Sequence, residues 1–264
     1  MQTGIIVVKI GGSTLGNHDT TLEDLVELQK QGRSLVVVHG GGKVTSQWLD
    51  RLGIPTSFVN GLRVTDDQGL KVVTATLGGL VNKELVVAIQ ALGGKAVGLS
   101  GCDGNLLWAS VKGPGWGFVG EVVAVDATPL ELLLGAGYMP VVAPVSFGLV
   151  EGRTTLLNVN GDTAAGEIAV ALGAEKLVFL TDVGGIHDGS SHTIPRLNLV
   201  EARDLLTSGV ASGGMIPKLE ASLNALTAIH EVHIIDGRVA HALLDDNAGL
   251  PQQIKLRGTA IVRQ

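Results

Sequence analysis

The feature that most constrains this chain is an apolar run near its start, Ile5-Ile6-Val7-Val8-Lys9-Ile10, followed by Gly11 and Gly12. A run without polar alternation is typical of a strand that a parallel sheet buries on both faces. Its one charge, Lys9, needs an anion or a wet cleft if it is buried. The glycines allow a sharp turn and leave N–H groups free for that anion. The stretch therefore predicts a phosphate site, with a lysine snorkelling off a strand end as the open alternative.

A second unit of the same kind follows directly. Residues 35–39 are expected to form a buried strand that ends in Gly40-Gly41-Gly42, and residues 43–52 a helix. Right-handed crossovers between parallel strands bring equivalent loops to one edge of the sheet. We therefore expect both glycine loops to open into one crevice, of the kind in which open α/β sheets bind ligands.

Composition and charge limit the remaining possibilities. The 264 residues are 45% hydrophobic and only 3% aromatic, which fits an aliphatic α/β core in one large domain or two lobes. The net charge of −6 argues against nucleic acid. A single cysteine, Cys102, excludes an internal disulfide and fits a reducing compartment. No apolar run approaches about 18 residues, so we expect no membrane span and a cytoplasmic location.

Further along, the sequence predicts a regular succession of helices and strands. Pro140 and Pro144 indicate that the strand at 138–145 is short or lies at an edge. The pattern restarts from residue 158, so we expect an N-terminal lobe, 1–155, and a C-terminal lobe, 156–264. The other expected elements are helices at 19–31, 68–91, 162–172, 199–207 and 213–229, hairpins within 106–125, and strands at 95–99, 176–181, 232–235 and 259–262.

Three charged residues have both a plain and a functional interpretation. Lys218 falls in the first turn of a helix, where the macrodipole disfavours a cation by about 0.3–1 kcal/mol. A bound phosphate would explain it, but an exposed lysine that tolerates this cost is equally compatible. Asp162 is an ordinary N-cap, or an acceptor that holds two lysines, or a metal contact. Arg63 can fork onto a ligand carboxylate or pair with Asp66.

Several catalytic motifs are missing or incomplete. There is no P-loop, the GxGxxG match at 115–120 is not followed by a helix, and the histidine motif at 230–233 is one residue too short for HExxH. No Ser–His–Asp, Cys–His or paired-carboxylate set stands out. Phosphoryl transfer to a carboxylate needs no general base, because the acceptor is already ionised. It needs positive charge and positioning, which lysines at glycine loops and Mg²⁺ would supply.

Six segments, spread in order over essentially the whole chain, resemble the amino acid kinase family, most closely its acetylglutamate kinase branch. The resemblance implies a three-layer αβα sandwich with an open, mainly parallel sheet of about eight strands. It also implies that the N-terminal lobe binds the acyl amino acid and dimerises, while the C-terminal lobe binds ATP. The segments are Val8-Lys9-Ile10-Gly11-Gly12, Val38-His39-Gly40-Gly41-Gly42, Asn60-Gly61-Leu62-Arg63-Val64-Thr65, Asn158-Val159-Asn160-Gly161-Asp162, Thr181-Asp182-Val183-Gly184-Gly185 and Gly214-Met215-Ile216-Pro217-Lys218.

The same resemblance implies roles for individual residues. Lys9 and Lys218 would stabilise the transition state, and Asp162 would organise them. Arg63 would clamp the α-carboxylate, with Asn158, Gly41 and Gly42 also binding substrate. The implied reaction converts N-acetyl-L-glutamate and ATP, which carries Mg²⁺, into N-acetyl-L-glutamyl 5-phosphate and ADP, a step of arginine biosynthesis. The nucleotide would contact Gly11, Gly12, Asp182, Val183, Gly184, Gly185, Ile186, His187, Val210, Ala211 and Ser212.

Two departures from the family pattern affect these expectations. Gly161 stands where the family usually has alanine, which adds flexibility before Asp162. The chain also starts almost at its first strand, whereas arginine-inhibited relatives carry an extra N-terminal helix. We therefore expect a plain homodimer without that feedback. The alternatives are a kinase of carrier-linked glutamate or aminoadipate, which the acidic net charge disfavours, and a non-catalytic sensor, which would not need both lysines.

Overall fold

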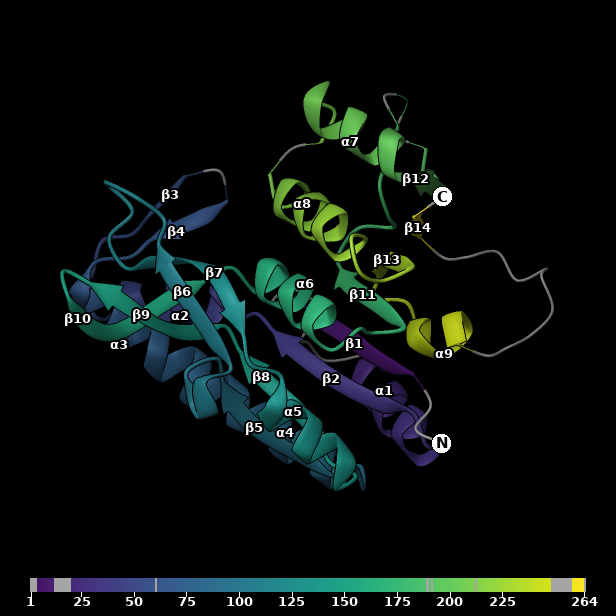
Figure 1. The fold of residues 1–264 in the computed structure, drawn as a ribbon, viewed down its shortest axis with the longest axis horizontal. Helices are drawn as coiled ribbons and strands as arrows, with labels where there is room; N and C mark the ends of the chain where they lie inside the picture. Colours follow the sequence, from purple (N-terminus) through teal and green to yellow (C-terminus); the bar gives the residue numbers. More distant parts are fainter. Residues whose placement is uncertain are drawn as a thin grey trace.

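One eight-stranded sheet runs through the residues that the computed structural model describes, 4–11, 20–59, 61–188, 190, 192–211, 213–247 and 258–263 (Figure 1). Its strand order is β12-β14-β13-β11-β1-β2-β8-β5, and all neighbours are parallel except β13 and β14. This confirms the predicted open, mainly parallel sheet. The strands are β1 (Ile5–Ile10), β2 (Ser34–His39), β5 (Ala96–Ser100), β8 (Met139–Ala143), β11 (Lys176–Thr181), β12 (Arg196–Asn198), β13 (Glu231–Asp236) and β14 (Thr259–Val262).

Strand β1 lies at the centre of the sheet because its side chains are apolar on both faces. It pairs with β2 on one side and β11 on the other, so Lys9 lies between Val38 and Phe179 in the register. Successive side chains point to opposite faces. Ile6 and Val8 join one core cluster and Val7 joins the other. Lys9 therefore points to the same face as Val7.

Helices cover both faces of the sheet and form the three layers that the sequence predicts. On the Val7 face lie α5 (Thr128–Gly135), α6 (Gly161–Ala171), α7 (Leu199–Thr207) and α8 (Met215–Ala225). On the Ile6 face lie α1 (Thr21–Lys30), α4 (Asn82–Ala91) and α9 (Ala242–Asn247). The helix α2 (Gly42–Arg51) begins at the glycine loop that follows β2. Lys9 thus points toward the layer that contains α6 and α8.

A long continuous helix needs separate comment, because we expected no membrane span. It consists of α3 (Asp67–Val73), a π-helical segment η1 (Thr74–Val81) and α4, and over its 25 residues it is apolar and long enough to cross a membrane. Its inner side packs on the sheet, where Val81, Leu85 and Ile89 belong to the buried core. Length and composition therefore match a span, while the buried side matches a core helix.

The N-terminal half carries a small closed barrel and a hairpin beside the sheet (Figure 1). The barrel consists of β6 (Leu107–Val111), β7 (Val119–Val125), β9 (Val145–Val150) and β10 (Arg153–Val159). Antiparallel pairing of β6 and β7 confirms the predicted hairpin, but closure through parallel pairing of β10 with β7 was not predicted. The hairpin is β3 (Ser57–Val59) and β4 (Leu62–Val64), and a short 3₁₀ turn, η2 (Asp103–Asn105), precedes β6.

Two predictions concern the position of β8 in the sheet and the boundary between the lobes. The suggestion that prolines place β8 at an edge is wrong, because β8 lies between β2 and β5. Its pairing with β2 begins only at Val141, so the missing N–H of Pro140 leaves no gap in that ladder. The alternative of a short strand is correct. The predicted lobe boundary at 155/156 falls inside β10, and the division into lobes stays a prediction.

Candidate active site

The centre of the site is the carboxylate of Asp162, at the start of α6. Asn160 caps this helix, because its side chain accepts hydrogen bonds from the backbone N–H groups of Asp162 at 2.8 Å and Thr163 at 3.1 Å. The plain interpretation of Asp162 as the N-cap is therefore wrong. Its two oxygens are free for lysines: Lys9 Nζ lies 2.8 Å from Oδ1, and Lys218 Nζ lies 3.3 Å from Oδ2.

All three charges of this triad are largely removed from solvent. The side chains of Lys9, Asp162 and Lys218 are 9%, 6% and 12% exposed. Burial alone would raise the pKa of Asp162, but the two ammonium groups, Lys9 first, outweigh it and hold the pKa below its usual value. Two cations thus face one anion. The remaining positive charge makes this a place where a phosphoryl group is stabilised.

A metal ion held by the protein does not fit here. Both oxygens of Asp162 already face lysines, and within the described ranges no group of three or more His, Cys, Asp or Glu residues could hold a metal. The interpretation of Asp162 as a metal contact therefore has no support from its surroundings. Any Mg²⁺ would have to arrive on the phosphates of a nucleotide.

The first cavity, of about 220 Å³, opens beside Lys9 and Asp162. The predicted substrate residues Gly41, Gly42, Arg63 and Asn158 all line it. The Asn158 side chain donates to Thr65 Oγ1 at 3.0 Å, which fixes its orientation. Sequence reasoning missed most of the apolar wall, since these hydrophobic residues belong to none of the six segments: Phe58, Val73, Leu77, Val119 and Pro144.

Arg63 is held over this cavity by contacts on several sides. Its Nη2 donates to the Gly42 carbonyl at 3.0 Å and to Ser46 Oγ at 2.7 Å, and the guanidinium stacks 4.6 Å from the Phe58 ring centre. Asp66 instead caps α3 through the Gly69 N–H, so the expected alternative of an Arg63–Asp66 pair is wrong. Among the described residues Arg63 Nη1 has no hydrogen-bond partner. Burial lowers the pKa of the guanidinium from its ordinary value.

The glycine loops agree with the sequence prediction only in part. Gly41 and Gly42 open α2, and the hydrogen bonds of the described residues give their N–H groups no protein acceptor. Gly11 differs, because its N–H donates to the Leu180 carbonyl at 3.2 Å and so continues the ladder of the sheet. The expectation of a free amide at Gly11 is therefore wrong. Gly12 lies outside the described residues.

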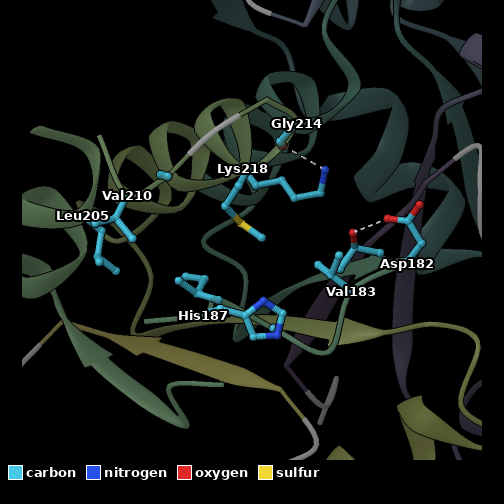
Figure 2. A pocket seen from close by; sticks show the side chains of 12 residues that line it. Asp182, Val183, His187, Leu205, Val210, Gly214 and Lys218 are labelled. Atoms are coloured by element: carbon cyan, nitrogen blue, oxygen red, sulfur yellow. Dashed lines mark hydrogen bonds between the residues drawn. The ribbon is translucent and has the colours of Figure 1, made fainter. Parts of the chain in front are cut away.

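The second cavity, of about 320 Å³, lies on the other side of Lys218, between the loop after β11 and the helices α7 and α8. Figure 2 shows Leu205 and Val210 on one side, Asp182 and Val183 opposite, and Lys218 and His187 at the remaining sides. Seven of the predicted nucleotide residues line it: Asp182, Val183, Gly185, Ile186, His187, Val210 and Ala211.

Two further residues predicted to contact the nucleotide are not among the described residues that line this cavity, and two residues without an assigned role are. Gly184 belongs to the same loop but does not line the cavity, and Ser212 lies outside the described residues. Leu205 and Met215 also line the cavity; Leu205 lies in none of the six segments, and Met215 lies in the segment 214–218 but was given no role there. Their side chains project from α7 and from the first turn of α8. The packing of α7 against α8 brings these two side chains to one pocket, and their residue types alone do not indicate it.

The two cavities meet at the charged triad. Lys9 and Asp162 line the first cavity and Lys218 lines the second, while Asp162 contacts both ammonium groups. A group bound in one cavity could therefore reach a group bound in the other past two fixed positive charges. This arrangement is suited to moving an anionic group between two ligands.

Comparison with known proteins gives consistent matches. Residues 4–236 match the model of the amino acid kinase family. The acetylglutamate kinase of Dehalococcoides mccartyi is 45% identical over 243 residues, 91% of this chain and 89% of that protein. The acetylglutamate kinase of Prochlorococcus marinus is 49% identical over 247 residues, 90% and 79% respectively. The structure of N-acetylglutamate synthase from Neisseria gonorrhoeae, with coenzyme A and N-acetylglutamate, has a TM-score of 0.83 and 26% identity, covering 99% of this chain and 60% of that chain.

Proposed function

Since this chain belongs to the amino acid kinase family, we propose that it transfers the terminal phosphoryl group of ATP to the side-chain carboxylate of N-acetyl-L-glutamate. The products are ADP and N-acetyl-L-glutamyl 5-phosphate, which places the enzyme in arginine biosynthesis. The observation that carries the proposal is the contact of Lys9 and Lys218 with Asp162, where the two cavities meet. The names of the relatives supply the identity of the acceptor.

The chemistry follows from the charges around the reacting atoms. The bond between the γ-phosphorus and the bridging oxygen of ADP breaks, and a bond from phosphorus to a carboxylate oxygen of the acceptor forms. No proton has to be removed, because the acceptor is ionised at neutral pH. Lys9 and Lys218 stabilise the negative charge of the transferring group, and Asp162 keeps their side chains oriented toward each other. Mg²⁺ enters as part of the nucleotide substrate.

The two cavities divide the substrates between them. Acetylglutamate occupies the cavity beside Lys9, where Arg63 offers its unpaired Nη1 to the α-carboxylate and the amides of Gly41 and Gly42 face the acceptor end. ATP occupies the cavity between α7, α8 and the loop after β11, with its phosphates toward Lys218. Both substrates then lie on the carboxyl-end side of the sheet, as is typical of open α/β folds.

We further propose that the protein is a homodimer. Leu80 and Val87 lie two helical turns apart on the long helix and are 38% and 63% exposed, so they share one outward apolar face. A second copy of the chain would cover this face. Light scattering tests it: Val87→Glu should shift a dimer toward monomer, whereas Val200→Glu, at a valine that is 68% exposed on α7, should not.

A cytoplasmic location is part of the same proposal. ATP and the reducing environment that suits the free thiol of Cys102 are both cytoplasmic. Fractionation of cells that express the tagged protein tests this location, and recovery in the membrane fraction would contradict it.

The direct test of the function is substrate-dependent release of ADP from MgATP. Free N-acetyl-L-glutamate, N-acetyl-L-aspartate, L-glutamate and a carrier-linked glutamate serve as the panel of acceptors. Turnover should be fastest with free N-acetyl-L-glutamate. Turnover only with the carrier-linked acceptor would replace the proposal by a carrier-dependent kinase, and nucleotide binding without turnover on any acceptor would indicate a sensor.

A further inference from the structure

A buried polar pair lies directly behind the glycine loop 40–42 and has no part in the proposed chemistry. His39, the last residue of β2, and Asn82, the first residue of α4, are both 0% exposed. We propose that His39, Asn82 and the π-helical segment η1 form a positioning unit that fixes the backbone amides of Gly41 and Gly42 for phosphoryl transfer. This inference rests on the proposed function for its kinetic consequence, but not for its structural one.

The hydrogen bonds of the pair fix the orientation of both side chains. Asn82 Nδ2 lies 2.8 Å from the Val141 carbonyl and 3.3 Å from the Leu99 carbonyl, so this atom is the amide nitrogen. It also lies 3.1 Å from His39 Nε2, which must therefore accept. The imidazole proton then sits on Nδ1, which donates to the Gly40 carbonyl at 2.7 Å. The ring thus ties the first residue of the loop to the sheet.

A neutral ring is required for this arrangement, and the surroundings of His39 keep it neutral. Burial lowers the pKa of His39 to about 4, and the nearby charges of Lys9 and Lys83 act in the same direction. Lys83 Nζ itself donates to Asn82 Oδ1 at 3.0 Å and to the Gly98 carbonyl at 3.0 Å. The neutral ring that this arrangement requires is therefore the form present at neutral pH.

The π-helical segment makes two further contacts, one with the first turn of α2 and one with the loop. The hydroxyl oxygens of Thr76 and Thr45 lie 2.9 Å apart; Thr76 donates to the Val72 carbonyl at 2.7 Å, so Thr45, on α2, donates to Thr76. A Cβ at Gly41 would meet Leu77 Cδ2 at 2.6 Å, which shows how closely η1 packs against the loop. π-helical turns are rare and are frequently found at functional sites.

Three residues of the unit act on the loop from outside the ligand cavity. None of His39, Thr76 and Asn82 is among the residues that line the cavity beside Lys9. They act on Gly40 and on the first turn of α2, whose free amides face that cavity. A misplacement of about 1 Å at the reacting atoms can cost about 100-fold in rate. Substitution of His39, Thr76 or Asn82 should therefore reduce catalysis without removing any side chain that lines the cavity, whereas Leu77 of η1 does line it and is left unchanged.

The experiment compares Asn82→Ala with a matched control, Asp24→Asn. Asp24 is also buried, at 1% exposed, and also holds a histidine, since its Oδ1 lies 2.8 Å from His241 Nδ1, but it lies outside both cavities. Hydrogen–deuterium exchange of the segment 38–45, read by mass spectrometry, should be faster in Asn82→Ala and unchanged in Asp24→Asn. The kcat should fall about 10- to 100-fold in Asn82→Ala, with KM for ATP changed less than about threefold, and stay within about twofold in the control.

A conservative pair separates positioning from loss of packing. His39→Gln keeps an acceptor toward Asn82 and should retain most of kcat, whereas His39→Leu keeps only the volume and should behave like Asn82→Ala. If Asn82→Ala does not fold, Thr76→Val tests the same positioning role. It removes the hydrogen bond between Thr45 and Thr76 at nearly constant side-chain volume, and it should also speed hydrogen–deuterium exchange of the segment 38–45.

The outcomes distinguish this inference from the proposed function. Unchanged exchange and kcat in Asn82→Ala, or equal losses in Asp24→Asn, would overturn the positioning role. An inactive wild type with N-acetyl-L-glutamate would overturn the proposed function, while the exchange data would still decide whether the unit orders the loop.

Discussion

Lys9 Nζ lies 2.8 Å from Asp162 Oδ1, and the two side chains are 9% and 6% exposed. The lysine comes from the central strand and the carboxylate from the first turn of a helix that Asn160 caps. Because the cap is a neighbouring residue, Asp162 is free to hold Lys9 and, through its other oxygen, Lys218. The ion pair thus depends on two local features of the sequence. One is a lysine within a buried strand, and the other is that Asn160, rather than Asp162, caps the helix.

Asp162→Asn should destabilise the protein and reduce activity. The substitution leaves two buried ammonium groups without their counter-charge, and breaking a buried ion pair costs about 3–5 kcal/mol. Urea unfolding should therefore show a lower midpoint, and kcat should fall at least about 100-fold. Asp67→Asn is the control, because its pair with Lys71 is 67–73% exposed and contributes about 0.5 kcal/mol or less. Equal midpoints for the two variants would contradict the proposed role of the buried triad.

Lys218→Ala should lower kcat by about 100- to 1000-fold with a modest effect on KM for ATP. The ammonium group lies at the junction of the cavities, where charge develops in the transition state, whereas most of the nucleotide cavity is formed by other residues. Steady-state kinetics of ADP release measure both constants. Lys71→Ala, on an exposed helical turn, serves as the control. A near-normal kcat in Lys218→Ala would remove this lysine from the mechanism.

Arg63→Lys should raise KM for the acyl amino acid about 10-fold and change kcat less. Lysine keeps the charge but lacks the planar fork, in which one nitrogen donates to the Gly42 carbonyl and Ser46 while the other faces the ligand carboxylate. It also loses the planar stacking on Phe58. Arg51→Lys, at an arginine stacked on Trp48, is the matched control and should leave KM unchanged. The same KM in both variants would show that Arg63 does not clamp the carboxylate.

The sequence predicted the regular core well and the small elements poorly. The bounds of β11, α7 and β14 were predicted to the residue, since uniform apolar runs and helical spacing define such elements locally. Closure of the barrel depends on parallel pairing between Asn158 and Val119, which are distant in the chain, so no local pattern encodes it. Lys9 was singled out because a charge in a buried strand is unusual, and Lys218 because a cation is disfavoured in the first turn of a helix.

The errors in the candidate site have equally local causes. Asn160 and Asp162 are both good capping residues, and spacing alone did not decide which one caps α6. The amide expected to be free at Gly11 is used because Leu180, which is paired with Ile10 in the register of β1 and β11, offers its carbonyl to it. Leu205 was missed, and Met215 was given no role although it lies in the segment 214–218, because a hydrophobic residue that lines a ligand pocket resembles any core residue in the sequence.

His39 should make stability depend on pH in a defined window. Its pKa is about 4 in the folded protein and about 6.5 in the unfolded chain. Between these values the unfolded chain binds a proton that the folded protein does not, so the free energy of unfolding falls as pH falls, by about 1.4 kcal/mol per unit. The variant His39→Gln has no titrating group at this position, so its urea midpoint should decline less steeply between pH 6.5 and 4.5 than that of the wild type. Parallel curves for both proteins would mean that His39 titrates normally.

Gly161→Ala should stabilise the protein. The glycine is the first residue of α6, and a Cβ there would lie 3.5 Å from Lys9 Cε and 3.6 Å from the His39 carbonyl, which are ordinary contacts. Because its φ is not in the left-handed region, alanine fits and mainly reduces the entropy of the unfolded chain, by about 0.4–1 kcal/mol. A thermal scan should show Tm raised by about 1–4 °C. Gly148→Ala is the contrasting control, since its Cβ would clash with the Ala109 carbonyl oxygen and should lower Tm; a lower Tm in Gly161→Ala as well would show that the start of α6 requires glycine.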